Sequence, residues 1–530
     1  MRVSVDRWHG VLASPWQRGA VAVAAGALPA LAFPEPSLWW LAYAALVPWL
    51  LLVRTAPTWR RAAYDGWLGG TGFMIAVHHW LLPNLHVFTL VIGLLLGVLW
   101  APWGVLVRRL LGGTPRPRRT AAALVLVPAG WIAVETVRSW EALGGPWGLL
   151  GASQWQVTPA LRLVSIGGVW LVTFLIVVLN TALTIVIALP TARTAAVAGG
   201  LTVAVAGSAA WAWVPQPDRT GSVRIAVVQP GVIQGGVDGR ERRFDREEEL
   251  TRQLAGKDVD LVVWGESSVS ADLGTRPDLR DRLAALSREV NADLLVNVDA
   301  QRSDRPGIFK SSVLVGPEGP TGARYDKMRL VPFGEYIPFR SALGWATSVG
   351  EAAAEDRRRG TTPVVMRIPG AGGLRIGPLV CFETAFPDMS RRLVKDGADV
   401  LVAQSATSTF QQSWAPEQHA SLAALRAAES WRPVVHATLT GVSAVHGPRG
   451  EAVGERLGTD SSAAMVYDVP LTTGTSPYVT AGDWVLYASL VSLAVYGVAE
   501  GARAVRRRPV QGPPGPPVRT VHGSAERPRR

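Results

Sequence analysis

Residues 377–383 read Gly-Pro-Leu-Val-Cys-Phe-Glu and contain Cys381, the only cysteine in a chain of 530 residues. The apolar run before Cys381 is typical of a buried strand, and Glu383 two residues later indicates the start of a polar turn. We therefore expect the thiol at the end of a strand. A lone cysteine cannot form an internal disulfide, which leaves packing as a small hydrophobe or chemical reactivity. The surrounding segments decide between the two.

The strand that ends at Cys381 belongs to a region, residues 220–470, of ordinary globular composition. Apolar, β-branched runs alternate there with helical patterns. This alternation predicts an α/β fold in which helices cover the faces of a sheet. The predicted strands are 223–228, 261–264, 294–298, 311–315, 374–381, 400–403, 434–438, 443–445 and 464–466, and the predicted helices are 247–254, 277–290, 388–396 and 416–430.

Two other segments of this region bring charge to the end of a strand or to the loop beside it. Residues 261–267 (Leu-Val-Val-Trp-Gly-Glu-Ser) form a buried strand that ends on Glu266. Lys327 precedes a loop rich in Pro, Gly and aromatic residues that carries Glu335. Such positions converge at one edge of an α/β sheet, where these folds place their sites. Lysine is scarce, and all four lysines lie in this region: Lys257, Lys310, Lys327 and Lys395.

The residue types in these segments suit nucleophilic catalysis by a thiol. A thiol attacks as the thiolate, so it needs a base or a nearby cation. We expect burial to raise the proton affinity of Glu266, which then takes the thiol proton. Lys327 would stabilise the thiolate and the oxyanion together with the backbone N–H of Phe382, and Glu335 would hold Lys327 or assist proton transfer. Taken singly, these residues also suit a helix cap, a surface charge and a solvated loop acid.

The first 215 residues have a different character, with long apolar stretches and 17 of the 22 tryptophans lying before residue 220. About 20 mostly apolar residues cross a bilayer as a helix, and Trp gathers near the ends of such spans. The sequence predicts a membrane domain over residues 1–215 with about seven transmembrane helices, a C-terminal transmembrane helix over 478–502, and a disordered, basic, Pro/Gly-rich tail over 503–530. The candidate spans are roughly 17–33, 37–53, 65–82, 87–107, 120–137, 161–189, 194–214 and 480–500.

Arginine placement predicts how these spans are oriented. Arg60, Arg108 and Arg193 lie in alternate loops, whereas the turns at 34–36 and 83–86 have no Lys or Arg. By the positive-inside rule, the region 220–470 lies on the outer face of the cytoplasmic membrane and the tail returns to the cytoplasm. The formal net charge of +12 is therefore interpreted as a topology signal and not as a nucleic-acid surface.

The loop over residues 138–160 is apolar, aromatic and Gly-rich. Two interpretations remain open for it: a segment in the membrane interface that shapes lipid access, or a packed re-entrant turn. Glu135 and Arg138 lie three residues apart on one face of the preceding helix and are expected to form a structural pair.

The order Glu266, Lys327, Cys381 and the flanking spans resemble the apolipoprotein N-acyltransferases, the membrane-embedded branch of the nitrilase superfamily. The segment Lys-x-x-Leu-Val-Pro-Phe-Gly-Glu-Tyr-x-Pro, which starts at Lys327, sharpens the resemblance. It implies an αββα sandwich and a Glu-Lys-Cys triad. Glu266 is then the general base, Lys327 the oxyanion lysine, Cys381 the nucleophile and Glu335 a supporting acid. Phe382 and Glu383 match the positions after the nucleophile.

The resemblance also implies a substrate and a route. A phospholipid donates its acyl chain through a thioester on Cys381, and the acceptor is the α-amine of the diacylglyceryl-cysteine of an apolipoprotein. No cofactor, metal or nucleic acid is expected. The alternatives are a membrane-anchored amidase with water as the acceptor, and a non-catalytic membrane scaffold. Seven spans before the domain count against the first, and the intact triad counts against the second.

Several further residues are candidates for substrate contact. Arg329, Tyr336 and Trp345 are possible substrate-loop residues, and 339–354 is either a lid over the thioester or an ordinary surface loop. The family commonly has His where Arg329 stands. The chain also departs from the family pattern at 405–409 and Leu439. These departures concern the acceptor side, and they leave open whether acceptor specificity or activity differs from that of the family.

Overall fold

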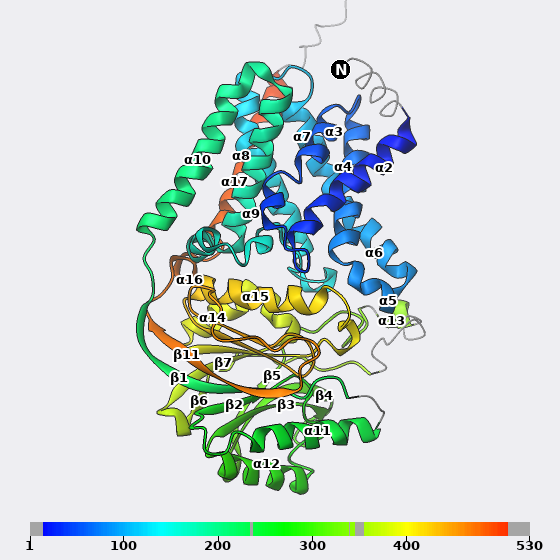
Figure 1. Cartoon of the computed structure of the whole chain (residues 1–530). Coiled ribbons are helices and arrows are strands. Elements are labelled where there is room, and N and C mark those ends of the chain that lie inside the picture. The colour runs from blue at the N-terminus through cyan, green and yellow to red at the C-terminus, as the bar shows by residue number, and fades with distance from the viewer. Residues whose placement is uncertain (1–13, 234–236, 339, 345–354, 507–530) are drawn as a thin grey trace, which may run out of the picture.

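The computed structural model describes residues 14–233, 237–338, 340–344 and 355–506. Figure 1 shows a helical half, built from the N-terminal chain and the last helix, above an α/β half. Trp345 and most of the candidate lid 339–354 lie outside the described residues, so their proposed roles stay predictions.

The helical half consists of apolar helices joined by short turns. Among the described residues, five helical segments are long and apolar enough to cross a membrane: Val87–Leu111, Pro117–Arg138, Thr158–Ala188, Ala196–Trp213 and Trp484–Arg506. The candidate span 37–53 corresponds to the shorter apolar stretch Trp39–Arg54. The helices are α2 (Pro15–Ala27), α3 (Val47–Arg54), α4 (Trp59–Val77), α5 (Leu82–Leu85), α6 (Val87–Gly97), α7 (Ala101–Leu111), α8 (Pro117–Arg138), α9 (Thr158–Ala188), α10 (Arg193–Trp213), α16 (Pro477–Ala481) and α17 (Trp484–Arg506).

Small residues and one paired charge cluster allow these helices to pack closely. A Cβ on Gly26 of α2 would lie 1.9 Å from the carbonyl oxygen of Gly69 on α4, so only glycine permits that approach. The buried Asp65 accepts hydrogen bonds from Arg18 and Arg61, each at 2.8 Å. Buried charge in such a setting is tolerated because it is paired.

Helix α9 is broken at one point. Gly167 and Gly168 leave the helical conformation, and Gly168 has φ 66°. The N–H of Val169, just after the break, donates to Oε1 of Glu429 at 3.0 Å. Glu429 lies on α15 (Ala415–Ser430) in the α/β half, so a carboxylate of one half caps a helix of the other.

The α/β half contains two sheets. The six-stranded sheet has the order β11-β1-β2-β3-β4-β5, and the five-stranded sheet has the order β10-β9-β8-β7-β6. Every predicted strand is present, and β5 and β6 were not predicted. The strands are β1 (Asp218–Gln229), β2 (Leu261–Trp264), β3 (Asp293–Gln301), β4 (Ile308–Gly316), β5 (Gly319–Asp326), β6 (Met366–Ile368), β7 (Leu374–Val380), β8 (Val400–Ser405), β9 (Val434–Thr438), β10 (Ala444–His446) and β11 (Ala463–Thr473).

The two sheets form the middle of a four-layer arrangement (Figure 1). Helices α11 (Val237–Arg252) and α12 (Pro277–Val290) cover the outer face of the six-stranded sheet. Helices α14 (Pro387–Lys395) and α15 cover the five-stranded sheet on the side of the helical half. The predicted αββα sandwich is confirmed. Strands β1, β2 and β3 run parallel in one sheet, and β7, β8 and β9 run parallel in the other. Within each sheet the carboxyl ends of these strands therefore lie at a common edge, and the residues that follow β2 and β7 are the candidates for a site.

Candidate active site

Cys381 lies immediately after β7, at the start of a short 3₁₀ helix (Cys381–Ala385). Its φ of 51° is in the left-handed region, which a non-glycine residue adopts only when the surrounding structure enforces it. The backbone oxygen of Cys381 is 3.0 Å from Nε2 of His419 on α15. The side chain is half-buried. The strand end predicted from the sequence is therefore a sharp turn that presents the thiol.

Glu383 fixes this turn to the loop that carries Lys327. Its carboxylate is fully buried and accepts hydrogen bonds from the backbone N–H groups of Val380 at 2.8 Å and Met328 at 2.7 Å. It also accepts from the Tyr325 hydroxyl at 2.7 Å. Glu383 therefore supports the site through the backbone and holds two segments of different sheets in register.

Glu266 follows β2 in a position that the neighbouring sheet enforces. Its backbone N–H donates to the carbonyl of Ser405 at the end of β8, at 3.1 Å. A Cβ on the preceding residue, Gly265, would lie 2.0 Å from the backbone nitrogen of Leu439. The two sheets approach so closely here that only glycine fits, and the carboxylate behind it is directed into the site.

Four charged side chains form a buried ion quartet consisting of Glu266, Lys310, Lys327 and Glu335. Oε1 of Glu266 accepts from Lys310 at 2.8 Å and from Lys327 at 3.1 Å. Oε1 of Glu335 lies 2.8 Å from Nζ of Lys327 and 3.1 Å from Nζ of Lys310. Lys327 is fully buried. Each ammonium thus contacts both carboxylates, which is the arrangement that makes buried charge tolerable.

The two carboxylates of the ion quartet differ in their second oxygen. Oε2 of Glu335 accepts from the backbone N–H of Val331 at 2.9 Å. Within the described residues, nothing donates to Oε2 of Glu266, since both lysines approach its Oε1. Glu335 is therefore bound at both oxygens, whereas Glu266 keeps one oxygen available to accept a proton.

The proton affinity of Glu266 corrects one expectation. Burial does raise the pKa of this carboxyl, but the charges of Lys310 and Lys327 outweigh burial and lower the pKa from 4.5 to about 2. The prediction of a raised proton affinity was wrong because it considered one lysine, and the site holds two. Glu266 is therefore an ionised carboxylate at neutral pH.

The thiol is protonated in the resting site. Burial, followed by the charge of Glu266, raises the pKa of Cys381 from 9.0 to about 12, and the opposing effect of Lys327 is smaller. A stable thiolate is therefore not present before substrate binds. The arrangement suits removal of the proton by Glu266 while the sulfur attacks, so that charge passes to an oxyanion near Lys327.

Lys310 is the member of this site that the sequence analysis missed. It lies near the start of β4, opposite Asp299 on β3. Its backbone oxygen accepts from the N–H of Lys327 at 2.8 Å, which joins the two lysines directly. One signal existed: with four lysines in the chain, a lysine within an apolar strand pattern deserved a functional interpretation.

Comparison with known proteins identifies the two halves of the chain. Residues 25–182 match the family model of the apolipoprotein N-acyltransferase N-terminal domain, and residues 224–476 match that of carbon-nitrogen hydrolase. The apolipoprotein N-acyltransferase of Azotobacter vinelandii is 30% identical over 95% of this chain and 98% of its own length. The chain belongs to the apolipoprotein N-acyltransferase family. The Geobacter metallireducens enzyme of that name is 29% identical over 92% of this chain and 96% of its own length.

A solved structure also resembles the hydrolase part. The Nesterenkonia AN1 amidase from the nitrilase superfamily, in a mutant form, has 18% sequence identity and a TM-score of 0.36, and the match covers 52% of this chain and 100% of that one. The chain thus combines membership of this acyltransferase family with helices that are long and apolar enough to cross a membrane.

A carboxylate from the family's N-terminal domain reaches the loop beside the ion quartet. Glu141 is buried and accepts from the backbone N–H of Leu330 at 3.1 Å. It also pairs with Arg329 at 3.4 Å and with Arg359 at 2.7 Å. Arg359 in turn lies over the Tyr336 ring at 5.1 Å. Two of the predicted substrate-loop residues, Arg329 and Tyr336, therefore lie together at the boundary between the two halves.

The aromatic loop that carries Glu141 packs directly behind the thiol turn. Gly145 has φ 67°, and a Cβ there would lie 2.6 Å from Cζ of Phe382. The indole N–H of Trp147 donates to Gln418 on α15 at 2.8 Å. Arg138 holds the loop by donating to the carbonyl of Trp147 at 2.5 Å. The loop is packed, as the second of its two interpretations predicted, and a role in lipid access stays a prediction.

Glu135 and Arg138 both hold this loop. Oε1 of Glu135 accepts from the backbone N–H of Leu150 at 2.8 Å, while Arg138 binds loop carbonyls. Their structural role is therefore exerted through the loop backbone.

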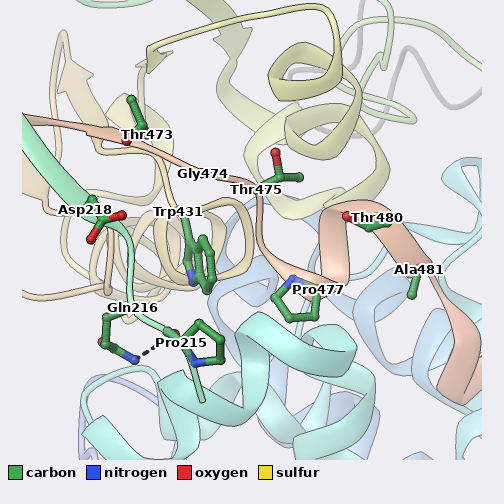
Figure 2. Close-up of a pocket in the computed structure, with 10 residues that line it drawn as sticks. All are labelled: Pro215, Gln216, Asp218, Trp431, Thr473, Gly474, Thr475, Pro477, Thr480 and Ala481. Carbon is green, nitrogen blue, oxygen red and sulfur yellow. Dashed lines mark hydrogen bonds between the residues drawn. The ribbon is translucent and has the colours of Figure 1, made fainter. Parts of the chain in front are cut away.

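A pocket of about 610 Å³ lies away from this chemistry, where α10 leads into β1 and β11 leads into α16 (Figure 2). Neither Cys381 nor a member of the ion quartet contributes to it. The pocket is lined by Pro215, Gln216, Asp218, Trp431, Thr473, Gly474, Thr475, Pro477, Thr480 and Ala481.

Among the described residues, no group of three or more His, Cys, Asp or Glu side chains is placed to hold a metal ion.

Proposed function

We propose that this protein moves a fatty acyl chain from a phospholipid to the N-terminal α-amine of the diacylglyceryl-cysteine of apolipoproteins, through a thioester on Cys381. The observation that carries the proposal is the half-buried thiol at a strained strand end, within electrostatic range of Glu266 and of the fully buried Lys327. Among the described residues, Oε2 of Glu266 accepts no hydrogen bond. Family membership supports the acyltransferase reaction, and the membrane spans support a lipid donor.

The first step forms the thioester. Sγ of Cys381 attacks the ester carbonyl carbon of the phospholipid while Oε2 of Glu266 takes the thiol proton. The Lys327 ammonium and the N–H of Phe382 stabilise the oxyanion of the tetrahedral intermediate. The intermediate collapses with cleavage of the carbon–oxygen bond, Glu266 returns its proton to the leaving alkoxide, and lysophospholipid departs.

The second step uses the same groups, with the acceptor amine as the nucleophile and the Cys381 sulfur as the leaving group. The neutral α-amine of the acceptor attacks the thioester carbonyl, and Glu266 takes a proton from the nitrogen. An amide bond forms, the carbon–sulfur bond breaks, and the proton passes from Glu266 to the departing thiolate. Glu335 keeps Lys327 in place through both steps, since it is bound at both of its oxygens.

The same proposal places the α/β half on the outer face of the cytoplasmic membrane, with α14 and α15 towards the bilayer. Arginine alternation in the loops supports this orientation. A phospholipid of the outer leaflet would then approach from the side on which the loop with Glu141 and Gly145 contacts the catalytic half.

Intact-mass measurement tests the proposal. Purified full-length protein is incubated with phospholipid, and Cys381→Ser is the control. We expect one added acyl mass on the wild type and none on the variant, and absence of the adduct on the wild type would overturn the mechanism. A diacylated lipopeptide should then discharge the adduct to a triacylated product. Discharge to free fatty acid alone would indicate a hydrolase.

A further inference from the structure

The ion quartet contains as many positive as negative charges, and Lys310 accounts for half of the positive charge. Without Lys310, the carboxylates of Glu266 and Glu335 would share the single ammonium of Lys327. Two carboxylates that share one site do not both stay ionised unless cations compensate them. The second lysine is thus what allows two buried carboxylates to exist side by side.

The distances indicate which carboxylate depends on Lys310. Lys310 is closer to Glu266, at 2.8 Å, than to Glu335, at 3.1 Å. Lys327 has the opposite preference, at 3.1 Å from Glu266 and 2.8 Å from Glu335. Glu335 also keeps its bond from the N–H of Val331. Loss of Lys310 would therefore leave Glu266 as the less compensated carboxylate and the first to take up a proton as the pH falls.

Lys310 is less suited to contact the substrate than Lys327 is. Its Nζ faces Glu266, Glu335 and, at 3.9 Å, Asp299. Asp299 is itself paired with Arg357 at 3.3 Å. The Lys310 ammonium is thus surrounded by carboxylates on three sides, so its effect on the reaction passes through them.

Resting on the function proposed above, we infer that Lys310 is a positioning residue that keeps both carboxylates of the ion quartet ionised, so that Glu266 stays able to take the thiol proton and Lys327 stays able to stabilise the oxyanion. The effect of Lys310 on the pKa of Glu266 agrees with this, since its charge is the largest influence that lowers it. The charged and titratable groups that face Glu266 or Lys310 are Lys327, Glu335, Asp299, Cys381 and His419, with Arg357 behind Asp299.

Alkylation of the single cysteine tests this inference without any acyl donor. Full-length protein in detergent is treated with iodoacetamide over a range of pH, and the adduct on Cys381 is followed by intact mass. At the neutral to alkaline pH of alkylation, both carboxylates are ionised with or without Lys310. Lys310→Met then removes only a positive charge near the thiol, so its alkylation profile should move to higher pH by about one unit, or about 10-fold in rate at fixed pH. Lys310→Arg should keep the wild-type profile, and the exposed Lys395→Met is the matched control.

Acyl-adduct formation from phospholipid supplies the second readout. The low-pH limb of its rate reports Glu266, and in Lys310→Met it should move to higher pH by about one unit or more because the carboxylate has lost its nearer cation. If Lys310 had only a structural role, Lys310→Met would lower the rate equally at every pH, and the pH of the low-pH limb would not change. If Lys310→Met does not fold, Lys310→Gln removes the same charge and retains a hydrogen-bond donor.

The two readouts separate the possible failures. If wild-type protein forms no acyl adduct, the proposed function fails, and the alkylation profiles alone then decide whether Lys310 sets the charge state of the thiol site. If the adduct forms but Lys310→Met and the wild type share the same alkylation profile and the same low-pH limb, the inference is overturned while the proposed function stands.

Discussion

The thiol of Cys381 lies between two regions of opposite character. On one side the ion quartet presents four charged side chains of the α/β half, linked by contacts of 2.8 and 3.1 Å. On the other side the loop with Gly145 packs against Phe382 and carries a single carboxylate, Glu141, which binds the backbone of Leu330. The two regions therefore have different roles. The ion quartet sets the proton affinities of Glu266 and Cys381, and the loop with Gly145 sets the position of the turn that carries Cys381.

Removing the proton acceptor should produce the largest effect and would test the first region. In Glu266→Gln we expect thioester formation to fall about 10²–10⁴-fold, because an amide cannot take the thiol proton. The measurement is the rate of acyl-adduct formation by intact mass, with the thermal unfolding midpoint as a check on folding. Acylation at the wild-type rate would show that another group is the base.

Crowding the turn tests the second region without touching a charge. Gly145→Ala places a methyl group 2.6 Å from Cζ of Phe382, so the Phe382 ring must move and is expected to displace the turn that carries it. A displacement of the thiol of about 1 Å costs about 10²-fold in rate. Gly144→Ala is the matched control, since Gly144 also has a positive φ but has open space around its Cβ position. Equal rates for the two variants would contradict a positioning role for the loop.

Weakening the link between the two halves should have a smaller effect. Glu141→Gln keeps the shape of the side chain but removes the charge that faces Arg329 and Arg359. We expect a fall of about 10-fold in the rate of thioester formation, equivalent to about 1.4 kcal/mol, as for a weakened hydrogen bond to a charged group. Glu417→Gln, which disrupts an exposed pair with Arg456, should leave the rate unchanged. A rate loss shared by both variants would argue against a specific link.

The last effect concerns stability at acidic pH and leaves the rate at neutral pH unchanged. Glu266 has a folded pKa of about 2 against an ordinary 4.5, so its ionisation stabilises the fold above pH 4.5, and this contribution is lost as the pH falls towards 2. Between these values the wild type should lose more unfolding free energy than Glu266→Gln, by a few kcal/mol. Thermal unfolding in detergent at a series of pH values measures the difference. Parallel curves would mean that the ion quartet does not depress this pKa.

The first region could largely be predicted from the sequence, because three of its four charged residues follow a strand or lie in an adjoining loop. The strand pattern located Glu266 and Cys381, and local order located Lys327 and Glu335. Lys310 was missed because a polar residue in an alternating strand is ordinarily a solvated one. The low pKa of Glu266 was missed as a consequence, because it depends on the charges of Lys310 and Lys327 together.

The second region could not be predicted because its contacts join distant parts of the chain. Glu141 meets Leu330 and Arg359 about two hundred positions later, and no periodicity encodes such a contact. The two unpredicted strands have a different cause. β5 has two buried residues out of eight and contains two glycines, and β6 has three residues at the edge of its sheet, so neither has the apolar run that identified the others.

The break in α9 makes the assembly of the protein depend on the order in which it is synthesised. Gly168 and the N–H of Val169 leave the ribosome about 260 residues before Glu429, the group that satisfies that N–H. An unsatisfied backbone group is costly within a bilayer. The nascent helical half therefore carries an unsatisfied N–H until the α/β half packs against it. The α/β half expressed alone would expose the Arg426–Glu429 pair, which is now fully buried.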